Sequence, residues 1–322
     1  EEENYFFLLS KYQKPLLEYL AREDTVVPEW RRQEAIKFVE KGLEDFSISR
    51  VTEKMPWGIP VPGDDSQVMY VWFDALTNYI STLGWPADTN RDFDKFWTNG
   101  EVMQMAGKDQ VRFQSIMWQA MLLSAGIKNT DRVLYHGFIT SGGQKMSKSL
   151  GNVISPLSIV EEYGTDALRY FLARHVHPFE DSDVTMDRFK EAYNADLANG
   201  LGNLVSRVTK LSQDNLDMPL NRPEPVDFPK EYTDAIDHFE FNRAIEFVWK
   251  EVQRLDATIT ETAPFRVIKT DKPQGVALIQ ELANDLYVLA RMLHPFMPHT
   301  SAVIKEAIIT NKKPENLFPR KE

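Results

Sequence analysis

The chain has 322 residues, of which 43% are hydrophobic and 26% are charged, as is ordinary for a globular protein of about two domains. It contains no run of about 18 apolar residues, so no membrane-spanning helix is expected. It contains no cysteine, which excludes disulfides and thiolate zinc sites within the chain, and its six histidines lack ligand spacing, so no metal site is expected. The net charge of −11 argues against a nucleic-acid-binding protein, which normally carries a basic footprint, although binding needs only a local basic surface.

The first part of the chain predicts helices followed by an α/β region. Residues 1–48 contain apolar residues at helical spacing and read as two amphipathic helices, the second beginning after Pro28. Apolar strand-like runs then alternate with helical segments. The strands are expected at 68–73, 101–106 and 132–138, and the helices at 75–83 and 110–125. This alternation predicts a parallel sheet with ligands beyond the carboxyl ends of its strands.

The second part predicts mostly helices. Ser155 followed by Pro156 is a helix start, Gly164 ends that helix, and Thr165 caps the next, expected at 166–174. Residues 191–322 contain three long apolar stripes at helical spacing, which predict a helix bundle. A proline-rich linker is expected at 218–229, and the tail after Lys312 is expected to be loose.

A basic loop at residues 142–152 holds two lysines, Lys145 and Lys148, between flanking glycines. Lysine ammonium groups are mobile point charges that suit phosphate oxygens. A mobile loop could place both charges on a polyphosphate and stabilise the negative charge that develops on a leaving group. A solvated polar loop with no such role is the alternative.

Residues 145–149, Lys-Met-Ser-Lys-Ser, are the signature loop of class I aminoacyl-tRNA synthetases, and the chain resembles the methionyl-tRNA synthetases among them. The resemblance covers roughly residues 1–300. It implies ATP with Mg²⁺, L-methionine and tRNA(Met) as substrates and partners. It also implies that Lys145 and Lys148 are catalytic and neutralise the β- and γ-phosphates of ATP.

Residues 72–79 are similar to the methionine-pocket segment of that family, which implies that Trp72, Ala75 and Tyr79 surround the methionine side chain. A polarisable thioether packs well against aromatic rings. Core packing of the tryptophan and tyrosine is the alternative.

Residues 107–114 resemble the segment that contacts ATP and the amino acid. Gly107 and Asp109 are implied in binding ATP or the adenylate, and Phe113 in closing the pocket. Gln114 stands in the pocket where the family usually has histidine, and Gln119 where proline is common.

Two further segments resemble active-site strings of the family. Residues 135–138 imply that His136 lies on the ATP side, with a satisfied buried histidine as the alternative. Residues 47–50 imply that Arg50 provides a charge in the active site, with a surface arginine as the alternative.

In the helical region, residues 195–207 are similar to the family's anticodon-reading helix. Asn203 and Arg207 share one helix face, and the resemblance implies that they hydrogen-bond unpaired anticodon bases. Phe265 stands where the family typically has a tryptophan for stacking, and a phenyl ring stacks with less surface.

The His-x-Gly-His-type motif of the family's first half does not occur in the sequence. The chain is therefore expected to be a carboxyl-terminal portion that acts with a missing amino-terminal half and is inactive alone. The expected fold is α/β plus all-α. Its parts are the end of an insertion (1–48), the second half of a Rossmann-like catalytic domain (49–140), the signature loop and stem-contact region (141–190), and a helical anticodon-binding domain (191–322).

The expected function is ATP-dependent ligation of methionine to tRNA(Met) through methionyl-adenylate, in the cytoplasm. One alternative is another class I synthetase, for leucine, valine or isoleucine, which would share the loop but not residues 72–79. The other alternative is a non-catalytic tRNA-binding or scaffold protein derived from such an enzyme.

Overall fold

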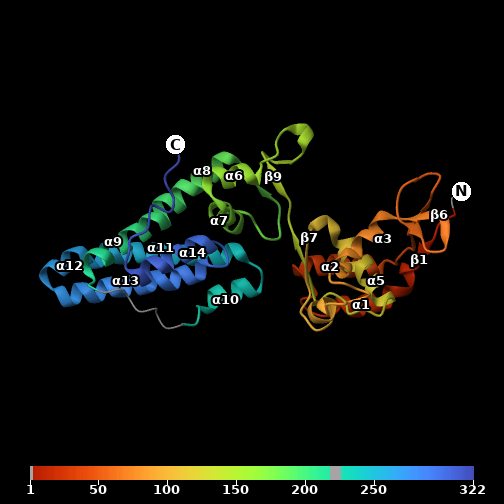
Figure 1. The fold of residues 1–322 in the computed structure, drawn as a ribbon, viewed down its shortest axis with the longest axis horizontal. Helices are drawn as coiled ribbons and strands as arrows, with labels where there is room; N and C mark the ends of the chain where they lie inside the picture. The colour runs from red at the N-terminus through yellow and green to blue at the C-terminus, as the bar shows by residue number, and fades with distance from the viewer. Residues whose placement is uncertain (1–2, 218–225) are drawn as a thin grey trace. The chain divides into compact units, whose positions relative to one another are not determined.

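The computed structural model describes residues 3–217 and 226–322, and the chain divides into two compact units, Glu1–His136 and Gly137–Glu322 (Figure 1). Each unit contains its own cluster of buried apolar side chains. Much of the linker predicted at 218–229 lies outside the described residues. No described helix is long and apolar enough to cross a membrane.

The first unit is built on a three-stranded parallel sheet in the order β2-β8-β7. Its strands are β2 (Val26–Val27), β7 (Met103–Gly107) and β8 (Arg132–His136). The predicted strands at 101–106 and 132–138 are thus confirmed within a few residues. Helices α1 (Gln13–Leu20), α2 (Glu29–Glu40) and α5 (Trp118–Ser124) pack with this sheet through one apolar core.

The third predicted parallel strand, at 68–73, is wrong. The chain there leaves β6 (Asp64–Met69), which pairs antiparallel with β4 (Ser49–Val51) and β5 (Pro60–Val61), and enters α3 (Val71–Leu76). Leu76 and Ile80 are buried four residues apart, so a helical period governs this stretch. A short apolar run does not distinguish a strand from a helix by itself.

The remaining elements of the first unit are short. Residues 1–48 are not wholly helical, because β1 (Phe6–Phe7) pairs antiparallel with β3 (Phe46–Ser47), and β2 also lies in this stretch. The other elements are the 3₁₀ helices η1 (Leu9–Tyr12) and η3 (Lys108–Gln110), the helix α4 (Asn78–Ser81), and the π-helices η2 (Asp94–Thr98) and η4 (Arg112–Met117). The helix predicted at 110–125 is therefore divided between η4 and α5.

The second unit begins with a β-hairpin, formed by β9 (Ile139–Ser141) and β10 (Gln144–Lys145), to which β11 (Ser182–Asp183) adds in parallel. Gly142 and Gly143 form the two-residue turn with φ values of 62° and 74°. A type I′ hairpin turn needs positive φ at both positions, which glycine adopts without strain.

Short helices follow the hairpin: the 3₁₀ helix η5 (Lys148–Leu150), α6 (Pro156–Tyr163), α7 (Thr165–His175) and α8 (Met186–Ala192). The Ser155 side chain accepts a hydrogen bond from the Ser158 N–H at 3.5 Å, which confirms the predicted start of α6. Gly164 separates α6 from α7, also as predicted. The predicted cap at Thr165 is wrong, because Gly164 holds the N-cap position and Thr165 is the first residue of α7.

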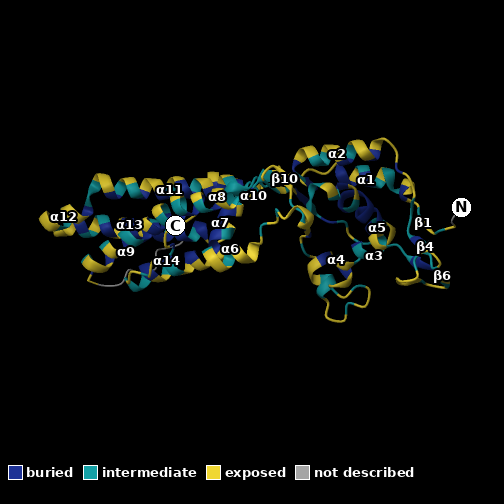
Figure 2. Ribbon diagram, turned by 90° about the horizontal axis from the view of Figure 1, so that it is seen from above, coloured by how far each residue is buried: buried dark blue, intermediate teal, exposed yellow. Residues whose placement is uncertain are grey.

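Residues 193–310 form the helix bundle, and its described part is helical as predicted. The helices are the π-helix η6 (Tyr193–Gly202), α9 (Asn203–Asn215), α10 (Lys230–Asp237), α11 (Phe241–Thr262), α12 (Pro264–Thr270), α13 (Lys272–Leu293) and α14 (Pro298–Thr310). Buried and exposed positions alternate along these helices, as expected for amphipathic helices that share a core (Figure 2).

The tail after Lys312 is not loose, contrary to the prediction. Phe318 is 7% exposed and packs into the bundle core. The Tyr193 hydroxyl donates to the Pro319 carbonyl at 3.0 Å, and the Asn194 side chain makes two hydrogen bonds with the backbone of Lys321. A single aromatic anchor with backbone hydrogen bonds leaves no periodic signal in the sequence.

Replacing a core leucine of the bundle should be costly. Leu286 on α13 is fully buried, so Leu286→Ala should lower the free energy of unfolding by about 2–5 kcal/mol through lost burial and a residual cavity. Urea titration followed by circular dichroism measures this change. Gln280→Ala, at an exposed position of the same helix, should change it by less than about 0.5 kcal/mol. Equal losses would contradict the assigned core.

The hairpin turn depends on Asp183. Its Oδ1 accepts hydrogen bonds from the Gly143 N–H at 2.7 Å and the Thr140 hydroxyl at 2.9 Å, and these bonds lower the pKa of the carboxyl. Because the pKa of Asp183 is lowered in the folded chain, the carboxylate stabilises the fold. This stabilisation is complete above the usual aspartate pKa of about 4 and is lost as pH falls through the lowered value. Asp183→Ala should therefore speed hydrogen exchange at the Gly143 amide.

Hydrogen exchange followed by NMR checks this expectation at neutral pH. Asp187→Ala removes an exposed carboxylate at the start of α8 and should leave the Gly143 amide unchanged. Unchanged protection of Gly143 in Asp183→Ala would show that the turn does not need the carboxylate.

Candidate functional site

Two aromatic rings from different elements meet in the first unit. Trp72 on α3 and Phe113 on η4 have ring centroids 4.8 Å apart with an interplanar angle of 35°. Trp72 remains 40% exposed, so this aromatic pair is accessible rather than locked in the core. Ala75 lies one turn further along α3 and is half-buried. The structure thus brings together Trp72 and Phe113, which the sequence resemblance assigned to one pocket.

The second pair of predicted pocket residues is joined by a hydrogen bond. Gln114 Nε2 donates to the Tyr79 hydroxyl at 2.7 Å, and Gln114 is only 5% exposed. Gln114 Oε1 is buried and has no hydrogen-bond partner among the described residues. The Tyr79 ring centroid lies 5.9 Å from that of the buried Trp118. The glutamine is therefore an integral part of the polar end of this cluster.

The candidate nucleotide residues lie at the carboxyl ends of two adjacent parallel strands. Gly107 ends β7 and is directly paired with His136, which ends β8. Asp109 follows in η3, is exposed, and accepts a hydrogen bond from Gln110 Nε2 at 3.1 Å. His136 is exposed, so it is not the buried histidine that was the alternative. This is the edge at which parallel sheets bind ligands.

Arg50 lies on β4 with local partners. Its Nη1 donates to the Ser47 hydroxyl and to the Ser49 carbonyl, both at 2.6 Å, and its guanidinium lies 4.3 Å from the centre of the Tyr70 ring. Tyr70 immediately precedes α3. The Arg50 guanidinium therefore packs on Tyr70, the residue before α3, rather than extending into solvent.

The signature loop belongs to the second unit and has a defined scaffold. Asn152 Oδ1 accepts a hydrogen bond from the Ser147 N–H at 2.9 Å, and its Nδ2 donates to the Lys145 carbonyl at 3.3 Å. Ser147 Oγ accepts from the Leu150 N–H at 3.3 Å and caps η5, which ends at Gly151 with φ of 65°. These contacts fix the backbone of the loop.

Both lysines of the loop are exposed. Lys145 Nζ lies 5.3 Å from the centre of the Phe138 ring, a distance at which the ring stabilises the cation. The Lys148 side chain makes no hydrogen bond or ion pair with any residue that the structure describes. The loop therefore presents two ammonium groups that can bind a polyanion without first breaking an ion pair.

The candidate anticodon residues lie on the bundle. Asn203 is exposed at the start of α9, and Phe265 on α12 is 42% exposed. Arg207, one turn after Asn203, forms an ion pair through Nη1 with Asp256 on α11. The sequence reasoning missed Asp256, because a single acidic residue on the polar face of a long helix carries no distinctive signal.

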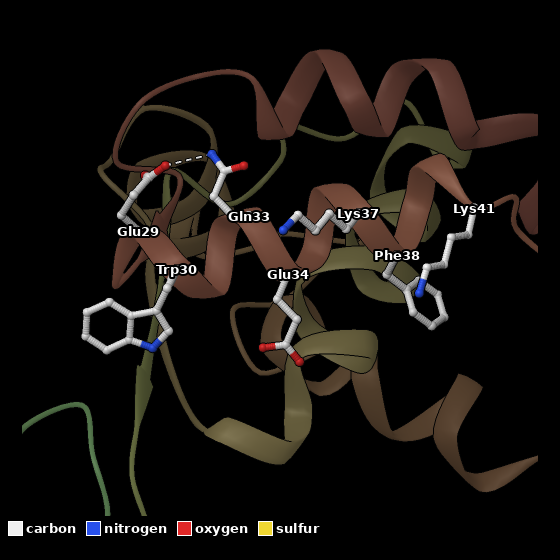
Figure 3. A pocket seen from close by; sticks show the side chains of 7 residues that line it. All are labelled: Glu29, Trp30, Gln33, Glu34, Lys37, Phe38 and Lys41. Carbon is white, nitrogen blue, oxygen red and sulfur yellow. Dashed lines mark hydrogen bonds between the residues drawn. The ribbon is translucent and has the colours of Figure 1, made fainter.

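A separate open pocket of about 690 Å³ lies along α2, lined by Glu29, Trp30, Gln33, Glu34, Lys37, Phe38 and Lys41 (Figure 3). None of the predicted site residues lines it. Among the described residues, no group of three or more histidine, aspartate or glutamate side chains is arranged to hold a metal ion. The residues predicted from the resemblance lie instead in the aromatic cluster, at the sheet edge, on the basic loop and on the bundle.

Comparison with known proteins agrees with this organisation. A family model described as tRNA synthetases class I (M) matches residues 1–209, and one described as the anticodon-binding domain of tRNA ligase matches residues 227–319. Methionine–tRNA ligase of Fusobacterium nucleatum is 40% identical over 98% of this chain, and that of a Nostoc species is 39% identical over 96%. The alignments cover 52% and 61% of those two relatives.

A solved structure is also similar. Mycobacterium tuberculosis methionyl-tRNA synthetase in complex with methionyl-adenylate superposes with a TM-score of 0.86 and 32% sequence identity, over 99% of this chain and 69% of that one. The fold is therefore the class I catalytic α/β architecture followed by a helical anticodon-binding domain, of which this chain spans a part. The family model that covers residues 1–209 assigns the chain: it belongs to the methionyl-tRNA synthetases of class I.

Proposed function

We propose that this chain is the carboxyl-terminal portion of a cytoplasmic methionine–tRNA ligase, which joins methionine to tRNA(Met) through methionyl-adenylate. The observation that supports this most is the cluster in the first unit: the Trp72 and Phe113 rings 4.8 Å apart, and the Gln114–Tyr79 hydrogen bond. Aromatic faces with one polar end suit an uncharged thioether side chain. The similar M. tuberculosis protein was solved with methionyl-adenylate, which supports the same ligand class.

In the first step, the methionine carboxylate attacks the α-phosphate of ATP, and pyrophosphate leaves. We assign Gly107, Asp109 and His136 to the nucleotide, because they lie at or next to the carboxyl edge of β7 and β8. Gly107 lets the backbone approach the ligand, since it has no side chain. Mg²⁺ accompanies ATP, and we expect the phosphate oxygens to supply its main ligands.

Lys145 and Lys148 act on the same step. Negative charge increases on the leaving pyrophosphate, and ammonium groups positioned there stabilise it more in the transition state than in the ground state. Both side chains are exposed on a loop whose backbone is held by Asn152. In the second step, the terminal ribose hydroxyl of the tRNA takes the methionyl group and releases AMP.

The bundle would identify the tRNA by its anticodon. Asn203 offers an amide and Arg207 a guanidinium for the edges of unstacked bases, while the exposed Phe265 offers a stacking face. Asp256 holds one end of the Arg207 guanidinium through their ion pair. The remaining N–H groups of Arg207 are then left to contact a base.

The first unit has an open edge that an amino-terminal half could complete. Strand β7 pairs only with β8 among the described strands, and its other edge is unpaired. Met103 and Met105 on this strand are 40% and 61% exposed. An unpaired strand with exposed apolar side chains is a template for a further strand. We propose that an amino-terminal half of the enzyme supplies that strand, and we assign residues 49–140 to the second half of the catalytic domain.

Methionine-dependent exchange between ATP and pyrophosphate tests the proposal. The isolated chain should show no exchange, because the proposed function assigns it only the second half of the catalytic domain. Fusing the amino-terminal part of the F. nucleatum relative to this chain should produce exchange that requires methionine. A folded fusion that binds tRNA but shows no exchange would favour the non-catalytic scaffold.

Lys148→Ala should separate catalysis from binding in the fused enzyme. Turnover in the exchange reaction should fall by about 10²–10³-fold, because a donor to the developing charge is lost. The dissociation constant for methionine should change by less than about threefold, since the proposed role of Lys148 is toward the phosphates and not toward the methionine side chain. Lys272→Ala, an exposed lysine at the start of α13, should leave both unchanged. Equal losses of turnover and affinity would remove the role assigned to Lys148.

A further inference from the structure

The turn that carries Phe113 and Gln114 is wider than an α-helical turn. In η4 (Arg112–Met117) the backbone follows π-helical geometry, and the Trp118 N–H donates to the Phe113 carbonyl five residues earlier. One extra residue in a turn changes the direction of every side chain on that turn relative to an α-helix. The wide turn therefore sets where Phe113 and Gln114 point.

The side chain of Gln119, in the first turn of α5, is bonded to this wide turn. Gln119 is completely buried. Its Nε2 donates to the Gln114 carbonyl at 2.9 Å and to the Thr130 hydroxyl at 3.0 Å. Its Oε1 accepts from Asn129 Nδ2 and from the Thr130 N–H, both at 3.1 Å. Both amide donors and both acceptor sites are thus used, which is the full capacity of this side chain.

These partners connect the wide turn to the parallel sheet. The Thr130 hydroxyl donates to Gln104 Oε1 on β7 at 2.8 Å, and the Thr130 carbonyl accepts from the Tyr19 hydroxyl at 3.0 Å. Ser115, next to Gln114, shares a hydrogen bond of 2.6 Å with the Tyr135 hydroxyl on β8. Gln119 is therefore the link between the Gln114 backbone and the part of the chain that enters β8.

We infer that Gln119 is a positioning residue for the side-chain pocket. It holds the wide turn open so that Phe113 faces Trp72 while Gln114 faces Tyr79. Without the Nε2 donor, the Gln114 carbonyl loses a buried partner, and the turn can tighten toward α-helical spacing. Successive side chains in an α-helix are about 100° apart. If the turn closes with one residue fewer, these side chains are redirected, and the contacts of Phe113 with Trp72 and of Gln114 with Tyr79 cannot both be kept. The identity of the pocket's ligand rests on the proposed function, whereas the geometric role of Gln119 does not.

The first test uses the chain as it is. With ¹⁵N-labelled glutamine, NMR reports the exchange of the Gln114 side-chain amide protons, which the buried hydrogen bond to Tyr79 protects. Gln119→Met keeps the length of the side chain but has no amide, and should lower this protection by about tenfold or more. Gln119→Leu also lacks the amide donors and is uncharged, so it gives the same expectation if the methionine variant does not fold.

Asn129→Ala is the matched control. It removes the Asn129 hydrogen bonds to the Gln119 carbonyl and Oε1, but leaves the bond from Gln119 Nε2 to the Gln114 carbonyl. Compared at equal stability in urea, it should keep the Gln114 protection within about threefold of the original chain. Unchanged protection in Gln119→Met would overturn the inference, because Gln114 would not depend on Gln119. An equal loss in both variants would also overturn it, because the effect would not be specific to the bond from Gln119 Nε2.

The second test uses the fused enzyme. Gln119→Met should raise KM for methionine by about tenfold or more and leave KM for ATP within about twofold, because only the side-chain pocket is displaced. An equal rise in both constants would overturn the positioning role. A fused enzyme that forms no methionyl-adenylate, while NMR shows the expected change at Gln114, would instead contradict the proposed function and leave the geometric inference standing.

Discussion

The parallel pairing of β7 with β8 is the constraint on which the first unit depends. It places Gly107 beside His136 at one edge of the sheet, and the chain leaves β7 directly into the turn that holds Phe113 and Gln114. The buried polar network around Gln119 and Thr130 then fixes that turn to the same two strands. The position of the turn that carries Phe113 and Gln114 is thus a consequence of strand pairing, because this turn is hydrogen-bonded to both strands through Ser115 and Gln119.

Two buried amide side chains, Gln114 and Gln119, lie in and beside the turn that carries Phe113. Amides in a core are costly unless their hydrogen bonds are complete, and Gln119 is fully satisfied while Gln114 leaves its Oε1 without a partner among the described residues. The satisfied amide supports the turn, and the unsatisfied one lies where a ligand is proposed to bind. A preorganised binding site needs residues held in place by a bonded support, which Gln119 provides, and a polar atom left for the ligand, which Gln114 Oε1 provides.

The second unit exposes positive charge locally although the chain as a whole is acidic. The chain carries a net charge of −11, yet the signature loop exposes two lysines that have no ion-pair partner among the described residues, and α9 presents Asn203 beside Arg207. Local charge, rather than the total, decides where a phosphate or a base can bind. The acidic balance therefore does not oppose a tRNA partner. Arg207, by contrast with the two lysines, is paired with Asp256.

The sequence by itself determined the features that depend on local chemistry. The start of α6 at Ser155, the break at Gly164, the helical stripes of the bundle and the strands at 101–106 and 132–138 follow from caps, glycine and periodicity, and the signature loop identified the family. Only the tertiary structure decided that β2 pairs with β8 in the parallel sheet, that residues 71–76 are helical, that Phe318 anchors the tail, and that Gln119 and Asp256 hold their partners. Each of these depends on contacts between residues far apart in the chain, and such contacts leave no pattern in the sequence near either residue.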